Sequence, residues 1–381
     1  MERFKTPAKI VNIIKSMYTN PTFRSKLQGR QSTRKRQQTG IRQGCPLSPY
    51  LFLVVMTAIW KDIHTRLEIK EMSDKRKNKS RRDLLQEPLP FTEVLYADDT
   101  ILIGHTKKDV EAQLQTLEDE AGKYGLNLNR KKCEHIKLNA RGVITCADGT
   151  TIKEVEQARY LGVKLHNKTK PEMEIKDRIW QTTATWNRLH KYWKLGQCSK
   201  KRKLQVWNAV IRSKLIYALQ TVYVSKAMMS KLNAFQNRGI RKILGWKSTY
   251  IERENTNAKL HKAANQILKQ GNRQDDYVTK FEKVSKTIKK MQLTYFGHLL
   301  REPPSEPTRQ AIIIGRHVNL AWKKRVGRPR KHWTISLMQR AWKITRNQLV
   351  CPNDPDKRRR FSYRDKKIVA WIEYAALWRL F

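Results

Sequence analysis

The sequence predicts an α+β fold, because short apolar runs in the first half give way to helical periodicity in the second. Residues 93–104, EVLYADDTILIG, hold two aliphatic runs on either side of the adjacent carboxylates Asp98 and Asp99. Aliphatic runs of this length predict strands, and an Asp pair between them favours a tight turn. From about residue 170 the apolar residues recur at helical spacing. The expected architecture is an antiparallel sheet packed by helices, followed by an all-helical region and a basic helical C-terminal region.

The remaining elements of the first half follow from caps, breakers and periodicity. In order, they are a helix over residues 7–18, a basic loop or hairpin over 30–42, a helix over 49–69 capped by Ser48, an exposed charged loop over 70–83, an amphipathic helix over 107–124 and short strands over 126–165. Gly125 suits the end of the fifth element, since glycine adopts the left-handed conformation that ends many helices.

Three apolar stripes predict three packed helices between residues 170 and 250, and their Trp side chains are expected in the core rather than stacked on bases. A polar, lysine-rich stretch with weak helical period follows over 252–290, and residues 302–309 form a Pro-rich linker. The expected domains are residues 1–168, 169–250, 251–300 and 301–381.

The charge balance predicts a polyanionic partner. The chain of 381 residues has 80 Lys and Arg against 33 Asp and Glu, a formal net charge of +47. Self-repulsion at this charge disfavours an isolated compact state, so nucleic acid is the expected partner and a membrane surface the weaker alternative. No apolar run approaches the length of a membrane-spanning helix, and no signal-peptide pattern opens the chain. We therefore expect an intracellular protein of the nucleus or cytoplasm.

The five cysteines predict free thiols. Cys45, Cys133, Cys146, Cys198 and Cys351 are widely spaced and form no CxxC pair or Cys/His cluster with zinc spacing. Their odd number and spacing indicate a reducing compartment and exclude a disulfide-stabilised secreted domain.

Four short segments occur in one order along the chain. They are GIRQGCPLSPY at 40–50, EVLYADDTILIG at 93–104, YGLNLNRKKC at 124–133 and RYLGV at 159–163. A lone Asp-Asp pair is most often an ordinary solvated turn. Together, however, the four segments resemble the palm of reverse transcriptases, and they are most similar to those of non-LTR (LINE-like) retrotransposons. Retroviral enzymes usually have Met or Val at the position of Ala97, and group II intron enzymes usually have two glycines where this chain has Gly44 and Cys45. The resemblance covers residues 5–165 well and the rest more loosely.

The resemblance implies a partial polymerase palm over 1–168, a helical thumb over 169–250 and a set of site residues. Asp98 would be the main metal ligand and Asp99 a weaker one, for Mg²⁺ or for Mn²⁺ in its place. Lys132 would lie near the nucleotide phosphates, although a solvated surface lysine explains it equally well. The other implied residues are Arg42, Gln43, Gly44 and Tyr96 at the nucleotide and template, and Tyr160, Leu161 and Gly162 at the primer end. The implied partners are an RNA template and a DNA primer.

The family pattern also places a carboxylate on a strand upstream of the Gln-Gly segment. Between Met1 and Lys61 the only acid is Glu2, and the first Asp is Asp62. By resemblance, the chain begins just after that strand, and Glu2 near the chain end is a poor substitute. We therefore expect little or no polymerase activity from this polypeptide alone.

The basic C-terminal region contains RVGRPRKHW at residues 325–333, in which the basic side chains Arg325, Arg328, Arg330 and Lys331 are candidates for contacts to a nucleic-acid backbone. The segment resembles an AT-hook, which places arginines in a narrow minor groove. A basic surface segment or a nuclear import signal is the ordinary explanation.

Two functional classes remain open at this point. The first is a reverse transcriptase-like fragment of a retrotransposon, and the second is a non-enzymatic nucleic-acid-binding protein derived from one. Both predict salt-dependent binding to nucleic acid. Only the first predicts a divalent cation at Asp98.

Overall fold

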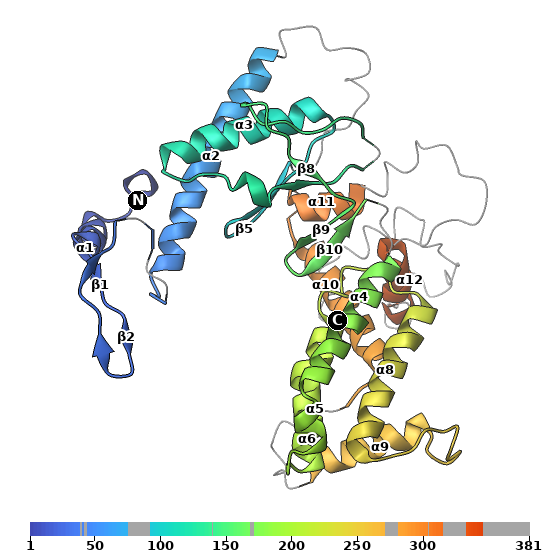
Figure 1. The fold of residues 1–381 in the computed structure, drawn as a ribbon. Helices are drawn as coiled ribbons and strands as arrows, with labels where there is room; N and C mark the ends of the chain where they lie inside the picture. Colours follow the sequence, from blue (N-terminus) through green and yellow to red (C-terminus); the bar gives the residue numbers. More distant parts are fainter. Residues whose placement is uncertain are drawn as a thin grey trace, which may run out of the picture. The chain divides into compact units, whose positions relative to one another are not determined.

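A computed structural model describes residues 1–38, 40–41, 44–74, 92–138, 140–167, 171–270, 281–303, 305–314 and 333–345. The chain divides into two compact units, residues 1–156 and 157–381. Helices alternate with short strands in the first unit and dominate the second, which confirms the α+β class (Figure 1). Each sheet among the described residues is two strands wide.

The first unit combines three α-helices with short strands. Its described elements are η1 (Glu2–Phe4), α1 (Ala8–Tyr18), β1 (Thr22–Phe23), β2 (Lys26–Leu27), β3 (Arg30–Gln31), β4 (Lys35–Arg36), α2 (Ser48–Asp74), β5 (Glu93–Tyr96), β6 (Asp99–Leu102), α3 (Lys107–Lys123), η3 (Arg130–Lys132), β7 (Glu134–His135) and β8 (Lys153–Glu154). Strands β1 with β4, β2 with β3, and β5 with β6 pair antiparallel, and β7 with β8 pair parallel.

Helices α1, α2 and α3 confirm the three helices predicted for this part of the chain. The prediction was wrong at the end of α2, which continues to Asp74, so residues 70–74 are helical rather than part of a loop. Charge density suggested the loop, but Lys, Glu and Met are good helix formers. The predicted loop over 75–83 lies outside the described residues. The basic loop or hairpin predicted over 30–42 is part of a longer hairpin. It begins at Thr22, and residues 30–36 form its second half.

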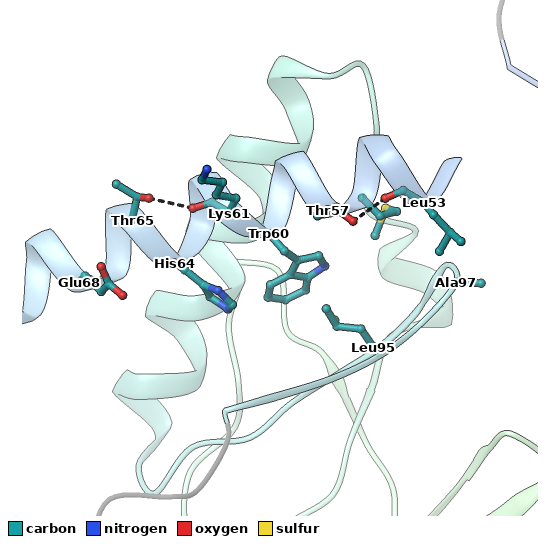
Figure 2. Close-up of a pocket in the computed structure, with 10 residues that line it drawn as sticks. Leu53, Thr57, Trp60, Lys61, His64, Thr65, Glu68, Leu95 and Ala97 are labelled. Carbon is teal, nitrogen blue, oxygen red and sulfur yellow. Dashed lines mark hydrogen bonds between the residues drawn. The ribbon is translucent and has the colours of Figure 1, made fainter. Parts of the chain in front are cut away.

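Two apolar clusters hold the first unit together. Ile59, Trp60 and Ile63 of α2 pack with Leu102 of β6 and Leu117 of α3. A second cluster joins α3 to the strands that follow it, through Leu114, Ile144, Cys146 and Ile152. A capping box closes the start of α3, where Thr106 and Asp109 each accept the other's backbone N–H. The hairpin β5–β6 is therefore fixed to two helices, and Figure 2 shows Trp60 facing Leu95 of β5.

The second unit opens with a hairpin and continues as helices. Its described elements are β9 (Gln157–Tyr160), β10 (Val163–His166), α4 (Pro171–Arg188), α5 (His190–Lys194), α6 (Lys200–Val206), the π-helix η4 (Trp207–Arg212), α7 (Ser213–Ile216), α8 (Lys226–Leu244), α9 (Asn257–Lys269), α10 (Val284–Arg301), α11 (Pro307–Ile314) and α12 (Trp333–Thr345). Helix α11 begins inside the predicted Pro-rich linker, with Pro307 at its first position, where a missing N–H costs nothing.

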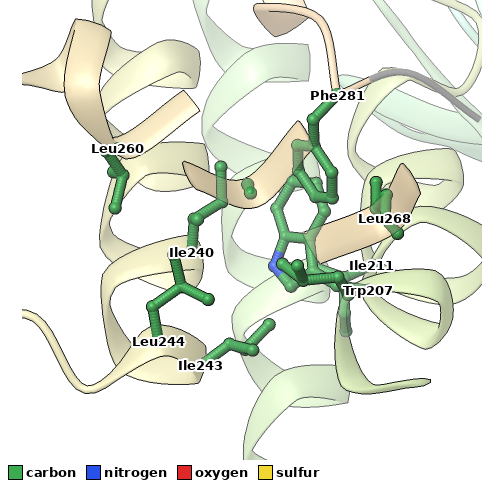
Figure 3. Packing of buried hydrophobic residues seen from close by; sticks show 10 residues of the cluster. Trp207, Ile211, Ile240, Ile243, Leu244, Leu260, Leu268 and Phe281 are labelled. Atoms are coloured by element: carbon green, nitrogen blue, oxygen red, sulfur yellow. The ribbon is translucent and has the colours of Figure 1, made fainter. Parts of the chain in front are cut away.

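The core of the second unit is built around Trp207. This side chain is fully buried, and its ring lies 5.4 Å from that of Phe281, centroid to centroid (Figure 3). Ile211, Ile240 and Leu260 pack in the same cluster. Trp186 and Trp193 stack at the edge of this cluster with a centroid distance of 4.4 Å. The expectation that these Trp side chains belong to the core is confirmed, because Trp186 of α4, Trp193 of α5 and Trp207 of η4 all belong to this cluster or pack against it.

A buried histidine gives the second unit a predicted dependence on pH. His261 Nε2 lies 2.9 Å from Asn237 Oδ1, and both residues are buried between α8 and α9. Burial lowers the pKa of His261 below its usual 6.5. The unfolded chain therefore takes up a proton at a higher pH than the folded one, and stability should fall as the pH drops through 6.5. Urea unfolding at pH 7.5, 6.5 and 5.5 measures this, and His261→Gln should flatten the dependence. An unchanged slope in that variant would contradict it.

The remaining sequence predictions concern thiols and membranes. Among the described residues, Cys45, Cys133, Cys146 and Cys198 are not joined by disulfide bonds, and Cys351 lies outside the described residues. Of the helices that the structure describes, none combines the length and apolar character needed to cross a bilayer.

Candidate functional site

The adjacent acids lie at the tip of the hairpin β5–β6. Tyr96 pairs with Asp99, so the hairpin that the sequence predicted is present, but its two-residue loop is Ala97 and Asp98 rather than the Asp pair, and Asp99 begins β6. Ala97 adopts a positive φ of 53°. A non-glycine residue in this region costs on the order of 1 kcal/mol, which the pairing of the two strands offsets. Tyr96, Asp98 and Asp99 are all exposed, so both carboxylates are open to a ligand.

The two faces of this hairpin differ. Leu95 lies opposite Thr100, and Glu93 opposite Leu102, on the face whose Leu102 packs against α2 and α3. Because side chains alternate along a strand, Tyr96 and Asp99 share the other face. At the tip end of this second face, the side chains of Tyr96 and Asp99 are exposed, whereas Val94 and Ile101 nearer the base are partly buried.

Contacts from α2 fix the base of the hairpin. His64 Nε2 lies 2.7 Å from Glu93 Oε1, at the first residue of β5. Thr92 Oγ1 donates to the other oxygen of the same carboxylate. These bonds fix the start of β5 to α2. The position of the hairpin tip therefore depends on the position of α2.

A groove of about 570 Å³ runs between α2 and β5 and ends beside the acidic tip (Figure 2). Its walls are mainly apolar, and the lining residues include Leu53, Met56, Trp60, Leu95 and Ala97. The indole Nε1 of Trp60 is buried and has no hydrogen-bond partner among the described residues. The tip therefore has a concave surface next to it, as a site that receives a ligand requires.

The Gln-Gly segment is only partly described. Gly44 lies in a turn just before α2, is exposed and has a φ of +83°, a backbone conformation that favours glycine. Arg42 and Gln43, the other predicted template-side residues, lie outside the described residues.

Lys132 lies in the short helix η3 and is exposed. Its neighbour Arg130 anchors that helix, because Arg130 Nε donates to Glu118 Oε1 at 2.8 Å and Nη1 bonds to Asp148. The bond to Glu118 raises the pKa of Arg130 further above its usual value. No hydrogen bond or ion pair in the described part of the chain joins Lys132 to the acids of the hairpin tip.

The donor set at the tip suits a hard cation only in part. Asp98 and Asp99 supply carboxylate oxygens, which Mg²⁺ prefers. Within the described ranges, however, no group of three His, Cys, Asp or Glu residues is arranged to hold a metal ion. Glu2, considered above as a substitute acid, is exposed in η1 and bonds to Lys15 at 3.0 Å, which lowers the pKa of its carboxyl. The acids at the tip thus form an incomplete ligand set.

The second predicted contact region is the tip of the hairpin β9–β10. Tyr160 pairs with Val163, which leaves Leu161 and Gly162 as a two-residue loop. Both have positive φ, 47° and 74°, the pattern of a type I′ turn that matches the twist of a hairpin. Leu161 is exposed at this tip, and the hairpin belongs to the second unit.

A buried ion pair holds this tip against α4. Arg178 Nε donates to Glu174 Oε1 at 2.6 Å, and both side chains are almost completely buried. Arg178 Nη2 donates to the carbonyl oxygen of Gly162 at 2.6 Å, and the guanidinium lies 4.8 Å from the centroid of the Tyr217 ring. Tyr217 Oη donates to the carbonyl oxygen of Leu161 at 2.9 Å. Both loop carbonyls are therefore fixed by side chains from the helices.

Sequence reasoning missed this clamp, which consists of Glu174, Arg178 and Tyr217. The signal available was weak: Glu and Arg four residues apart on a helix usually form an exposed pair. The predicted backbone contacts Arg325, Arg328, Arg330 and Lys331 lie outside the described residues.

Comparison with known proteins finds a match for the first part of the chain. Residues 1–165 match the family model described as reverse transcriptase (RNA-dependent DNA polymerase). This range contains the acidic hairpin, the groove, η3 and the tip of β9–β10.

Three relatives extend the comparison. The chain is 25% identical over 176 residues to the retrovirus-related Pol polyprotein of a type-1 retrotransposable element R2 from Nasonia vitripennis, covering 43% of this chain and 16% of the relative. It is 24% identical over 253 residues to the RNA-directed DNA polymerase of the mobile element jockey from Drosophila melanogaster, covering 63% of this chain and 25% of the relative. It is 23% identical over 256 residues to a putative uncharacterized transposon-derived protein of Caenorhabditis elegans, covering 65% of this chain and 84% of the relative. The chain thus spans a quarter or less of the first two relatives.

Proposed function

We propose that this chain binds an RNA template and a DNA primer, with the primer end near Asp98 and Asp99. The premise is that residues 1–165 are a reverse transcriptase segment related to those of non-LTR retrotransposons. The observation that carries the proposal is the pair of exposed carboxylates at a hairpin tip beside a groove, Asp98 in the loop and Asp99 at the start of β6, within the range that matches the family model. The second relative is named as an RNA-directed DNA polymerase, which agrees with this substrate class.

The carboxylates would hold Mg²⁺, or Mn²⁺ in its place. When bound, such a cation neutralises phosphate charge and stabilises the charge that develops in nucleotidyl transfer. Asp98 and Asp99 provide its oxygen ligands, and their exposure lets a nucleic acid supply further oxygens. Without the cation, the same two carboxylates repel the phosphates of a primer end.

The remaining groups would position the nucleic acid. Leu161 and Gly162 form a tip whose carbonyls are fixed by Arg178 and Tyr217, so the loop meets a primer in one conformation. Lys132 is exposed and forms no ion pair within the part of the chain that the structure describes, so its ammonium is available to a phosphate.

Metal-dependent binding tests the proposal. The probe is a fluorescent hybrid of RNA template and DNA primer with a recessed 3′ end, measured by anisotropy in EDTA and in Mg²⁺ at constant ionic strength. We expect Mg²⁺ to tighten binding about threefold or more, a free energy of about 0.7 kcal/mol. Asp98→Asn with Asp99→Asn should bind more tightly than the natural chain in EDTA, because the repulsion is gone, and should show no gain with Mg²⁺.

The control is Glu156→Gln, which removes an exposed acid outside the site. It should keep the full response to Mg²⁺. If the natural chain and the double variant respond alike, or if a hybrid without a recessed end binds equally well, the proposal fails.

Catalysis by this chain is expected to be slight, because among the described residues two carboxylates, and no third, lie together at the tip. Each tenfold of rate corresponds to about 1.4 kcal/mol, and an incomplete ligand shell costs several such steps. Primer extension with Mg²⁺ and dNTPs should therefore give product at or near the level of Asp98→Asn. Strong extension by the natural chain that Asp98→Asn abolishes would show that two carboxylates suffice.

A further inference from the structure

A basic β-ribbon in the first unit has no role in the function proposed above. Strands β1 and β4 form its base, β2 and β3 form its outer half, and Gln28 and Gly29 form its turn. The turn residues have φ of 47° and 80°, as a type I′ turn requires. Every residue of the four strands is exposed, and Figure 1 shows β1 and β2 as one narrow ribbon.

The charge on this ribbon is of one sign. Residues 22–36 contain six basic side chains and no acid. The basic residues are Arg24, Lys26, Arg30, Arg34, Lys35 and Arg36. None of them forms an ion pair with an acid in the described part of the chain, whereas Arg3, Arg66 and Arg130 of the same unit each do. The ribbon therefore concentrates positive charge that the protein itself leaves uncompensated.

The pairing register distributes these charges over both faces. Lys26 lies opposite Gln31, and Leu27 lies opposite Arg30, so neighbouring pairs point to opposite sides. Between the base and the outer half, two residues on the outgoing strand face three on the return strand, which makes a bulge. Ser32 N donates to Ser25 O at 2.9 Å across it. A bulge bends a ribbon and increases its right-handed twist.

The dimensions suit the major groove of a DNA duplex. From Thr22 to Gly29 the ribbon is about 23 Å long at the usual rise per residue of a strand. The major groove of B-form DNA, about 12 Å wide, admits a two-stranded ribbon, whereas the major groove of A-form RNA is too narrow. Basic side chains on both faces would then reach the phosphates along both walls.

We propose that residues 22–36 are an arm that enters the major groove of B-form DNA and binds its phosphates. The partner is duplex DNA because the charges require a polyanion and the ribbon requires a wide groove. This inference is independent of the primer end and of the acids at Asp98 and Asp99, so either proposal can fail without the other.

Salt-dependent binding to a 20-base-pair DNA duplex tests the arm. The variant Lys26→Gln, Arg30→Gln, Arg34→Gln removes three charges from exposed positions and leaves the turn intact. If each binds one phosphate, the slope of log affinity against log salt should become shallower by roughly 2 to 3, and affinity at 0.1 M salt should fall more than about 30-fold. The matched control is Lys9→Gln, Lys108→Gln, Arg141→Gln, which removes the same charge from exposed positions elsewhere in the unit.

The inference is supported if the slope of log affinity against log salt on duplex DNA becomes shallower in the ribbon variant and not in the control. It is overturned if both variants lose affinity equally, because the binding would then depend on net charge and not on the ribbon. It is also overturned if the ribbon variant loses as much on duplex RNA or on anionic phospholipid vesicles as on duplex DNA. As a second measurement, a photo-crosslinking residue, p-benzoylphenylalanine, in place of Leu27, which is 77% exposed near the turn, should crosslink to duplex DNA. Absence of a crosslink in a chain that still binds the duplex also overturns it.

Discussion

Arg178→Leu is expected to destabilise the second unit by about 3–5 kcal/mol, because it leaves a buried carboxylate without its partner. The side chains of Arg178 and Glu174 are only 4% and 6% exposed, so water cannot replace the lost bonds. The carbonyl of Gly162 loses its donor at the same time. Urea unfolding followed by tryptophan fluorescence measures the effect.

Two variants sharpen this test. Arg188→Leu removes an exposed arginine from the same helix and should change stability by no more than about 0.5 kcal/mol. The double change Arg178→Leu with Glu174→Leu should recover much of the loss, because no unpaired charge remains. If Arg178→Leu is no worse than Arg188→Leu, the pair does not hold the unit together.

Gly239→Ala is the second large expected loss. A Cβ at Gly239 would lie 2.5 Å from Trp207 Nε1 and 3.3 Å from Cε2, and Trp207 is fully buried. The indole cannot move aside without disturbing its packing on Phe281. Overpacking of this kind costs about 1–3 kcal/mol, more than the gain of up to about 1 kcal/mol from replacing a helical glycine. We expect a net loss of about 1–2 kcal/mol, measured by the same urea unfolding.

Gly122→Ala is the control for helix propensity. Gly122 lies in α3, and a Cβ there meets no atom within 4 Å. This variant should be neutral or up to about 1 kcal/mol more stable. A Gly239→Ala protein as stable as the natural chain would mean that α8 and η4 are not packed as closely as described.

Much of the fold was open to prediction from the sequence. The hairpin with Asp98 and Asp99 at its tip followed from two aliphatic runs around an Asp pair, because strand and turn preferences are local. Helix α3 followed in the same way from its periodicity and from Gly125 just after it.

What could not be predicted depends on contacts between distant residues. The pair of Glu174 and Arg178 looks like an exposed helix pair until β9–β10 covers it, and sequence spacing carries no information on that burial. The same holds for Gly239, which is an ordinary helix-weakening residue until Trp207 lies against it. The site itself was predicted as two acids on a loop, but the groove beside them depends on how α2 packs on β5.

The narrow sheets have a consequence for how the acidic tip behaves. Among the described residues β5 pairs with β6 alone, so brief local opening of this two-stranded ribbon costs far less than unfolding the helices around Trp207. Amide hydrogens beside Asp98 should therefore exchange with solvent long before those of α8. A ligand that binds the tip would stabilise the closed hairpin by its binding free energy. The hairpin is therefore expected to be most rigid when a ligand is bound.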